Sequence, residues 1–416
     1  MMEKQNSFLT RFFSLWIVCY VLIFIFTSQF HYQIPYQNLF VPCYQRLIPW
    51  FGKSFLHLPK LQRIGATGSG DTTFDYVLIL VNLLVALLLG IIILLLDYKR
   101  KSYRQLYLFV IVIARYFVAF SLLTYGFAKV FNGQFPSNGY HALLERVGNM
   151  SPMGILWTFM GASRPYTFIT GLIEVIGGTL LLFRRTKTFG ALFSMTAILM
   201  IVILNFTYDV PVKIFSSHLL LLCIFILSYD WKILFNFFIL HKSETLNYKK
   251  LRVKNKRMEF LIGLMKVVLV IYLFHSCISS MLPTLQKTVP PLEGLYTTRA
   301  MAWGNKDSIL FDKSDYRKWK NMYINYKGYL GIIFEDEKST RYKSEIDSSR
   351  KTIVIKPIDE NDVFAQFSYT INRDTLKLNG EIRNVPVMII LTRKGKKDFL
   401  LNNRGFHWIS EYPYHK

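Results

Sequence analysis

Seven apolar runs, each close to the roughly 20 residues that a helix needs to cross a bilayer, fill the first two thirds of this 416-residue chain. We expect seven membrane-spanning helices near residues 12–30, 76–96, 106–128, 166–183, 188–206, 214–235 and 259–281. The composition agrees, since 52% of the residues are hydrophobic and the mean hydropathy is +0.28. After Pro283 the chain becomes polar and rich in lysine, which indicates a separate water-soluble domain.

The formal net charge of +24 would favour a nucleic-acid partner if it formed a basic face on a soluble fold. Much of the excess lies instead in short loops between the apolar runs, so we expect no nucleic acid and take the lipid bilayer as the main partner. Basic residues in short loops stay cytoplasmic. Three such loops alternate correctly with the spans, at Asp97–Gln105, Arg184–Lys187 and His241–Arg257.

This alternation predicts a cytoplasmic N-terminus and an extracytoplasmic C-terminal domain. A cleavable signal peptide is the alternative for residues 1–30, but no small-x-small site follows the apolar run, so we expect a retained anchor. The four cysteines show neither CxxC nor zinc spacing, and cysteine chemistry is not expected.

Fixed charges lie inside two of the most apolar runs: Arg115 and Lys129 in the third, and Glu174 in the fourth. Charges at membrane depth are costly, and they usually face a bundle interior, pair, or serve function. By helical rise, Arg115 and Glu174 fall at similar depths, so we expect that they could meet. Gly171 and Gly178 share the helix face of Glu174 and would let another backbone approach closely. Two interpretations stay open: a buried ion pair that fixes helix pairing, or a ligand or proton site.

A second polar cluster lies at the expected outer end and contains Asp209, Lys213 and His218. Its charges could bind a ligand, or they could simply be solvated at the interface, which we favour. His218 and His275 lie at similar expected depths and could ligate a haem, but their spacing does not require it. No residue pattern indicates a metal site.

The glycine-rich stretch 65–75 lacks the features of a phosphate-binding loop, and we interpret it as the N-cap of the helix that begins near Tyr76. Beyond Pro283, short β-rich runs separated by turns predict a small antiparallel β domain, a sandwich or a barrel. Asn379-Gly380 is expected to be one of these turns. The aromatic final stretch, residues 400–413, could bind a partner, although we expect it to pack over a barrel.

The run Arg115…Gly126-x-x-Lys129, followed by Gly171-x-x-Glu174-x-x-Gly177-Gly178 and Arg185-Thr186, resembles the core signature of DoxX-family proteins. These are four-helix modules of the bacterial inner membrane, and the likeness covers roughly residues 107–240. Family members are linked to quinone-coupled redox complexes and to oxidative-stress assemblies. The resemblance therefore implies an inner-membrane protein with a periplasmic C-terminal domain and a quinone as the candidate cofactor. A weaker likeness is to the membrane portion of vitamin K-dependent carboxylases.

We divide the chain into four parts. Residues 1–105 form an N-terminal helix pair with an outer loop, and residues 106–240 form a DoxX-like four-helix core. Residues 241–282 form a basic cytoplasmic loop with the last span, and residues 283–416 form the β domain. The leading hypothesis is a subunit associated with a redox enzyme, in which Arg115, Lys129 and Glu174 hold a quinone headgroup. The alternative is a non-enzymatic envelope protein whose bundle anchors a β domain for a partner or lipid. A small-molecule transporter ranks third, because the sequence has no clear internal repeat or broken-helix pair.

Overall fold

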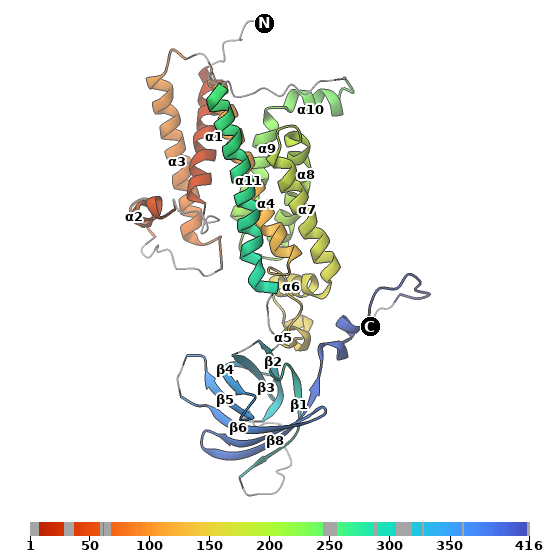
Figure 1. Cartoon of the computed structure of the whole chain (residues 1–416). Helices are drawn as coiled ribbons and strands as arrows, with labels where there is room; N and C mark the ends of the chain where they lie inside the picture. The colour runs from red at the N-terminus through yellow and green to blue at the C-terminus, as the bar shows by residue number, and fades with distance from the viewer. Residues whose placement is uncertain are drawn as a thin grey trace. The chain divides into compact units, whose positions relative to one another are not determined.

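The protein divides into two compact units in a computed structural model (Figure 1). The helical unit comprises Met1–Phe135 and Pro165–Pro283, and the barrel unit comprises Pro136–Arg164 and Thr284–Lys416. The structure describes residues 8–28, 37–58, 61, 68–100, 102–243, 256–285, 290–304, 318–326, 328–359 and 362–413.

Within these residues, six helices are long and apolar enough to cross a membrane. They are α1 (Phe8–Thr27), α3 (Thr73–Leu96), α4 (Arg104–Val130), α7 (Arg164–Leu182), α8 (Lys187–Thr207) and α11 (Lys256–Leu285). The seventh predicted span is broken: α9 (Lys213–Ser228) and α10 (Trp231–Phe238) meet at 83°. The membrane class of the chain therefore follows from its helices, and six of the seven expected spans are continuous.

The predicted outer loop 31–75 contains a helix that the sequence analysis did not anticipate, α2 (Gln37–Leu56). It carries Pro42 and Pro49 inside the helix, which argues against a helix in sequence-based reasoning. Its Ile48 is buried against Phe74 and Val77 of α3. Tertiary packing thus outweighs the low helix propensity of this segment.

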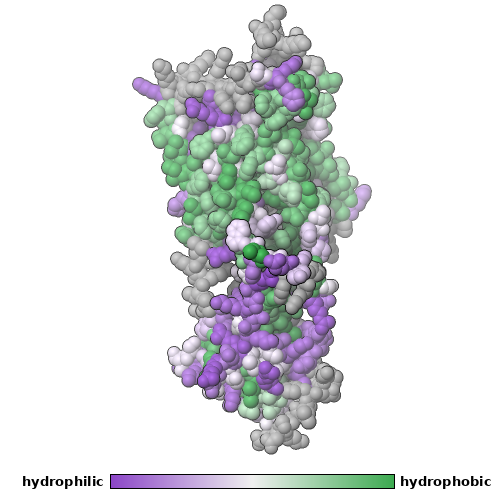
Figure 2. All heavy atoms as spheres, turned by 90° about the vertical axis from the view of Figure 1, so that its right-hand side faces the viewer, coloured by the Kyte–Doolittle hydropathy of each residue, from purple (hydrophilic) through white to green (hydrophobic). Residues whose placement is uncertain are grey.

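The helical unit is built around α4, whose Ala114, Val118 and Leu123 are fully buried in its main apolar cluster. Many large apolar side chains face outward instead, including Leu88, Leu95 and Phe189. Figure 2 shows a broad hydrophobic band over the helical unit on the face that it presents. Such a band suits contact with lipid tails and not with water.

The described parts of the basic loops lie at one end of the helical unit. Arg11 of α1 donates to the carbonyls of Tyr98 and Arg100 after α3. Arg104 of α4 donates to the Tyr229 hydroxyl after α9 at 3.1 Å. At the start of α8, Lys187 forms an ion pair with Asp230 at 2.8 Å. The helices therefore alternate in direction as the loop charges predict.

The β domain is a closed barrel of eight antiparallel strands in chain order. The strands are β1 (Gly294–Trp303), β2 (Trp319–Tyr326), β3 (Tyr329–Phe334), β4 (Ser339–Asp347), β5 (Thr352–Pro357), β6 (Ala365–Asn372), β7 (Thr375–Ile382) and β8 (Val385–Lys394). Pairing of β8 with β1 closes the barrel. Trp319, Phe367 and Met322 fill its core together with aliphatic side chains. Of the two expected architectures, the barrel is the one present, and it is larger than a minimal β domain.

Two expectations for this domain are wrong. Asn379-Gly380 is not a turn but lies inside β7, where Gly380 pairs with Phe367. A Cβ at Gly380 would lie 2.0 Å from the Gln366 carbonyl oxygen, so the glycine permits close strand approach. The aromatic ending does not pack over the barrel either, since the described residues 400–413 are all exposed. After η3 (Lys396–Asp398) and α12 (Leu400–Asn403), Phe406 and Trp408 are 79% and 91% exposed.

The segment between α4 and α7 belongs to the barrel unit. It contains α5 (Tyr140–Leu144), the short helix η2 (Val147–Asn149) and α6 (Pro152–Ala162). The Tyr140 amide donates to Asn325 Oδ1 of β2 at 3.0 Å, and the Tyr140 ring packs with Leu295 and Tyr323. The chain thus leaves the helical unit after α4, joins the barrel unit, and returns through α7.

Candidate functional site

Helices α4 and α7 cross closely because glycines face each other at the crossing. A Cβ added at Gly171 would lie 2.7 Å from the Gly126 carbonyl oxygen. One added at Gly178 would lie 2.9 Å from the Ala119 carbonyl oxygen. Since two backbones approach this closely only where side chains are absent, the crossing has a fixed register.

This crossing holds a buried ion pair. Lys129 of α4 donates from Nζ to both carboxylate oxygens of Glu174 of α7, at 2.6 and 2.8 Å. The two side chains are only 9% and 4% exposed. The Lys129 ammonium also lies 5.8 Å from the centre of the Tyr125 ring. Each charge therefore has a short partner inside an apolar bundle, which is what a buried pair requires.

Arg115 does not meet Glu174, contrary to the expectation from depth. The contacts Gly126–Gly171 and Ala119–Gly178 place α4 residues near position 123 opposite Glu174. Arg115 lies eight residues before that position on α4, which is about 12 Å at the helical rise. The expected depths of Arg115 and Glu174 in the membrane were similar, but the register of the α4–α7 crossing places the two residues apart.

Arg115 is nevertheless buried, with 4% of the residue exposed. Its guanidinium lies 5.1 Å from the centre of the Tyr116 ring, and its Nε has no hydrogen-bond partner in the described structure. The three charges that the sequence analysis grouped as one site thus form a pair and a separate cation.

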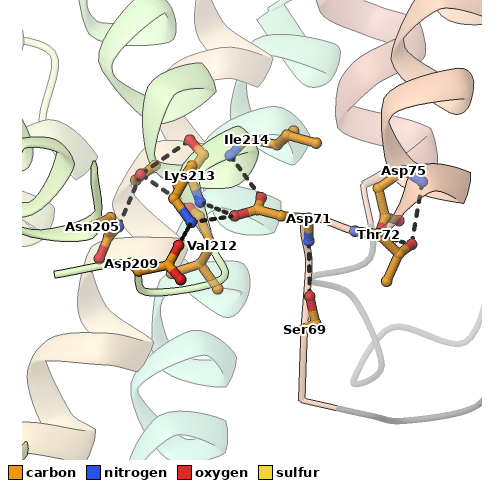
Figure 3. Close-up of polar contacts among 10 residues, drawn as sticks. Ser69, Asp71, Thr72, Asp75, Asn205, Asp209, Val212, Lys213 and Ile214 are labelled. Atoms are coloured by element: carbon orange, nitrogen blue, oxygen red, sulfur yellow. Dashed lines mark hydrogen bonds and ion pairs between the residues drawn. The ribbon is translucent and has the colours of Figure 1, made fainter. Parts of the chain in front are cut away.

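The expected outer cluster is organised by a residue far away in sequence, Asp71 (Figure 3). The Asp71 carboxylate accepts hydrogen bonds from the backbone amides of Lys213 and Ile214, at 2.7 and 2.9 Å, and so caps the start of α9. The Gly70 amide donates to the Pro211 carbonyl at 2.8 Å. The glycine-rich stretch thus joins the start of α3 to the turn between α8 and α9.

The cap of α3 itself is Thr72, which forms a capping box with Asp75. This agrees with the interpretation of the stretch as an N-cap. Asp71 lies in the same stretch, but the structure assigns its carboxylate to the start of α9 instead.

Lys213 and Asp209 pair at the surface of the outer cluster. Lys213 Nζ lies 2.7 Å from Asp209 Oδ1 and 3.9 Å from Asp71 Oδ2. The Asp209 side chain is 82% exposed, whereas that of Asp71 is 7% exposed. Beneath them, Asn205 donates to Ser216 at 3.0 Å. The geometry is that of a capped turn, with one exposed ion pair.

His218 is a residue of α9, and its side chain contacts α1. Its Nε2 is 2.6 Å from the Tyr20 hydroxyl, and its Nδ1 is 2.7 Å from the Ile214 carbonyl oxygen. Because the carbonyl only accepts, Nδ1 carries the proton and Nε2 accepts from Tyr20. The Phe24 ring stacks on the imidazole at 4.1 Å. Both ring nitrogens are engaged, so haem ligation through His218 would require loss of one of these bonds.

Asp71, Tyr20 and the Lys187–Asp230 pair were not predicted as site residues from the sequence. Asp71 and Tyr20 act on partners that are 142 and 198 positions away, and no local pattern marks such contacts. Asp230 had a usable signal: it is an acidic residue at the expected end of an apolar run, opposite a lysine at the start of another.

The fold and these clusters define a helical membrane protein that carries a separate eight-stranded barrel. The chain is 35% identical over 118 residues to the uncharacterized protein YwoB of Bacillus subtilis (strain 168), and the match covers 28% of this chain and 73% of YwoB. The chain therefore belongs to the same family as YwoB. No protein-family model and no solved structure matches it.

Proposed function

We propose that the helical unit is a DoxX-like module that binds the headgroup of a quinone at the Lys129–Glu174 pair. The observation that carries this proposal is a doubly hydrogen-bonded ion pair, 9% and 4% exposed, at a glycine crossing between apolar helices. A quinone ring has two carbonyl acceptors, which an ammonium can serve, and its reduced form has two hydroxyl donors, which a carboxylate can accept. The Lys129 ammonium and the Glu174 carboxylate therefore suit both the oxidised and the reduced form of a quinone.

The position of the pair supports a ligand from the lipid phase. A lipid-soluble ring reaches an apolar helix surface without passing through water, and a hydrophobic band covers the face of this unit that Figure 2 presents. Arg115 is left out of the proposed site, because the crossing separates it from Glu174. The cofactor, the inner-membrane location and the association with a redox enzyme all belong to this proposal.

The test uses full-length protein purified in mild detergent, with mass spectrometry of the extracted lipids and titration with a soluble quinone analogue. We expect bound quinone in the parent and a loss of binding in Lys129→Met with Glu174→Leu, which removes both charges together. The matched control is Lys213→Met with Asp209→Leu, which removes an exposed ion pair at the outer cluster. Parent protein that neither retains nor binds quinone, or a charge-free variant that binds it as well as the parent, would overturn the proposal.

A second candidate is an envelope protein in which the bundle anchors the barrel for a partner or lipid. It is favoured by the exposed aromatic ending, where Phe406, Trp408 and Tyr412 are 79%, 91% and 84% exposed. Because side chains fill the barrel core, binding would use its outer surface. A photo-crosslinker at Trp408 should then capture a defined partner in membranes, and one at exposed Ser349 should not. Transport ranks below both, because the α9–α10 break lies at the basic end and not in mid-bundle, where transporters interrupt their helices.

A further inference from the structure

Arg115 shares its level in the bundle with Arg184, at the end of α7. Gly178 of α7 lies against Ala119 of α4. Arg184 is six residues beyond Gly178, and Arg115 is four residues before Ala119. Because α4 and α7 run in opposite directions, both steps lead to the same end: α7 rises about 6 Å from Gly178 to its last residue, Leu182, with Arg184 in the turn that follows, and α4 covers about 6 Å from Ala119 to Arg115.

A third cation reaches this level from α11. Figure 1 shows α4 and α11 running in the same direction, and Thr124 Oγ1 lies 3.5 Å from Cys277 Sγ. Lys266 is eleven residues before Cys277, and Arg115 is nine residues before Thr124. The helical rise therefore places both about 13 to 17 Å from that contact. Lys266 is exposed on the bundle surface.

The three positive charges lie close enough to repel one another. Arg184 repels Arg115, and both arginines repel Lys266. No ion pair joins Arg115 or Lys266 to a carboxylate among the described side chains. In addition, the Nε of Arg115 is buried without a hydrogen-bond partner. Like charges held close together at membrane depth are unfavourable unless an anion offsets them.

The surroundings of this cluster suit the border between membrane and water. Arg184 is three residues before Lys187, which pairs with Asp230 directly before α10. Helix α10 turns by 83° from α9 and leaves Trp231, Phe235 and Phe238 exposed. A short helix with exposed aromatics at the end of a bundle is typical of a segment that lies in the headgroup region. The cluster thus lies on the side of the bundle that carries the basic loops, from which a lipid phosphate would approach.

We propose that Arg115, Arg184 and Lys266 form a binding site for a phosphate group, supplied by the headgroup of an anionic phospholipid or by free phosphate. The planar guanidinium of arginine donates two parallel hydrogen bonds to phosphate oxygens, and lysine adds a point charge. Arg115 supplies the buried donor, while Arg184 and Lys266 flank it at the surface. This site is separate from the Lys129–Glu174 pair, so it does not depend on the quinone proposal.

The test measures binding of phosphatidylglycerol, phosphatidylcholine and inorganic phosphate to the full-length protein in mild detergent, by native mass spectrometry and by the shift in thermal unfolding. We expect phosphatidylglycerol to bind and stabilise the parent more than phosphatidylcholine does. In Arg115→Gln with Lys266→Gln, its affinity should fall roughly tenfold or more, as for the loss of hydrogen bonds to a charged group. The control Lys232→Gln, on α10 at the same end, is charge-matched to the single variant Lys266→Gln and should bind as the parent does.

Comparison of the three ligands distinguishes the two sources of phosphate. Binding of phosphatidylglycerol that inorganic phosphate does not displace assigns the site to a lipid, and stabilisation by inorganic phosphate alone assigns it to free phosphate. Should the double variant fail to fold, exposed Lys266→Gln alone is the second variant, and its affinity should fall severalfold. Equal binding by parent and cluster variants, or an equal loss in Lys232→Gln, overturns the proposal.

Discussion

At the scale of single residues, both carboxylate oxygens of Glu174 accept hydrogen bonds from the Lys129 ammonium, so each buried charge depends on the other. Removing only Lys129 leaves a buried carboxylate unpaired. We therefore expect Lys129→Met alone to destabilise the bundle by about 3 to 5 kcal/mol. Thermal unfolding in detergent measures the loss.

Removing both charges has a different effect. Lys129→Met with Glu174→Leu leaves no unpaired charge, so its stability should lie within about 1 kcal/mol of the parent, since apolar replacement of buried pairs is often neutral. A double variant as unstable as Lys129→Met would contradict this. Quinone binding in the double variant then separates the two interpretations of the pair: a structural clamp would leave binding intact, and a ligand site would not.

Tyr296 of β1 provides a test of pH dependence. Its hydroxyl donates to the Leu292 carbonyl at 3.0 Å, and burial in the barrel raises the pKa of Tyr296 to about 12 from 10.0. The folded state thus holds this proton more tightly than the unfolded state does. The resulting stability is fully present below pH 10 and is lost as the pH rises toward 12, a total of about 2 to 3 kcal/mol.

The measurement is the ultraviolet absorbance of phenolate in the parent and in Tyr296→Phe. The difference between the two titrations should have its midpoint near 12. A midpoint near 10 would show that Tyr296 is accessible to solvent.

At the scale of elements, the α4–α7 crossing depends on the absence of a side chain at Gly171. A Cβ there would meet the Gly126 carbonyl oxygen and Lys129 Cβ, both at 2.7 Å. Gly171→Ala should therefore separate the helices and cost about 1 to 3 kcal/mol, as overpacking does. Gly263→Ala in α11 is the control, because a Cβ there meets nothing within 4 Å, and it should not lower the thermal midpoint. Equal effects of the two variants would show that the crossing is not tight.

The junction of α3 and α9 depends on Asp71. Loss of its carboxylate leaves the amides of Lys213 and Ile214 without their cap, so Asp71→Ala should cost about 1 to 2 kcal/mol. Asp209→Ala removes only the exposed partner of Lys213 and should cost less than about 0.5 kcal/mol, because surface pairs contribute little. Thermal unfolding of the two variants side by side checks the order, and the reverse order would show that Asp209 is the main anchor.

The elements differ in how far local sequence could predict them. The β6 strand was predictable, because Ala365, Phe367 and Tyr369 alternate with exposed residues. The β4 strand was not, since only Tyr342 and Ser344 are buried along its nine residues, and its other side chains resemble a polar loop. Closure of the barrel joins β1 to β8 across the whole domain, and no local pattern encodes that pairing.

The same difference holds for the candidate site. The charges in apolar runs were visible in the sequence, and the glycine faces indicated a close crossing. The partner of Glu174 was not predictable, because Arg115 and Lys129 both lie on α4 and only the contact register selects Lys129. Long-range caps such as Asp71 leave no sequence signal at their targets.

At the scale of the whole molecule, the number of crossings decides whether the two chain ends lie on the same side of the membrane. Six continuous helices alone would place them together. Helix α9 is only 16 residues long, about 24 Å, yet its ends reach both ends of the bundle. Lys213 joins Asp71 at one end, and Tyr229 joins Arg104 at the other. Counting α9 as a crossing gives seven, an odd number, so we expect the barrel to lie opposite the basic loops.

Cysteine labelling in spheroplasts tests this topology. In a Cys43→Ser background, which removes the exposed cysteine and leaves three buried ones, cysteines are introduced at Ser349 in a barrel turn or at Lys242 after α10. A membrane-impermeant maleimide should label Ser349→Cys in intact spheroplasts and Lys242→Cys only after permeabilisation, because basic loops stay cytoplasmic. The opposite pattern would contradict this topology, because the barrel would then lie on the cytoplasmic side, through either inversion of the bundle or return of α9 and α10 to the surface they came from. Labelling of both positions from one side would mean that α11, which separates them in the chain, does not cross the membrane.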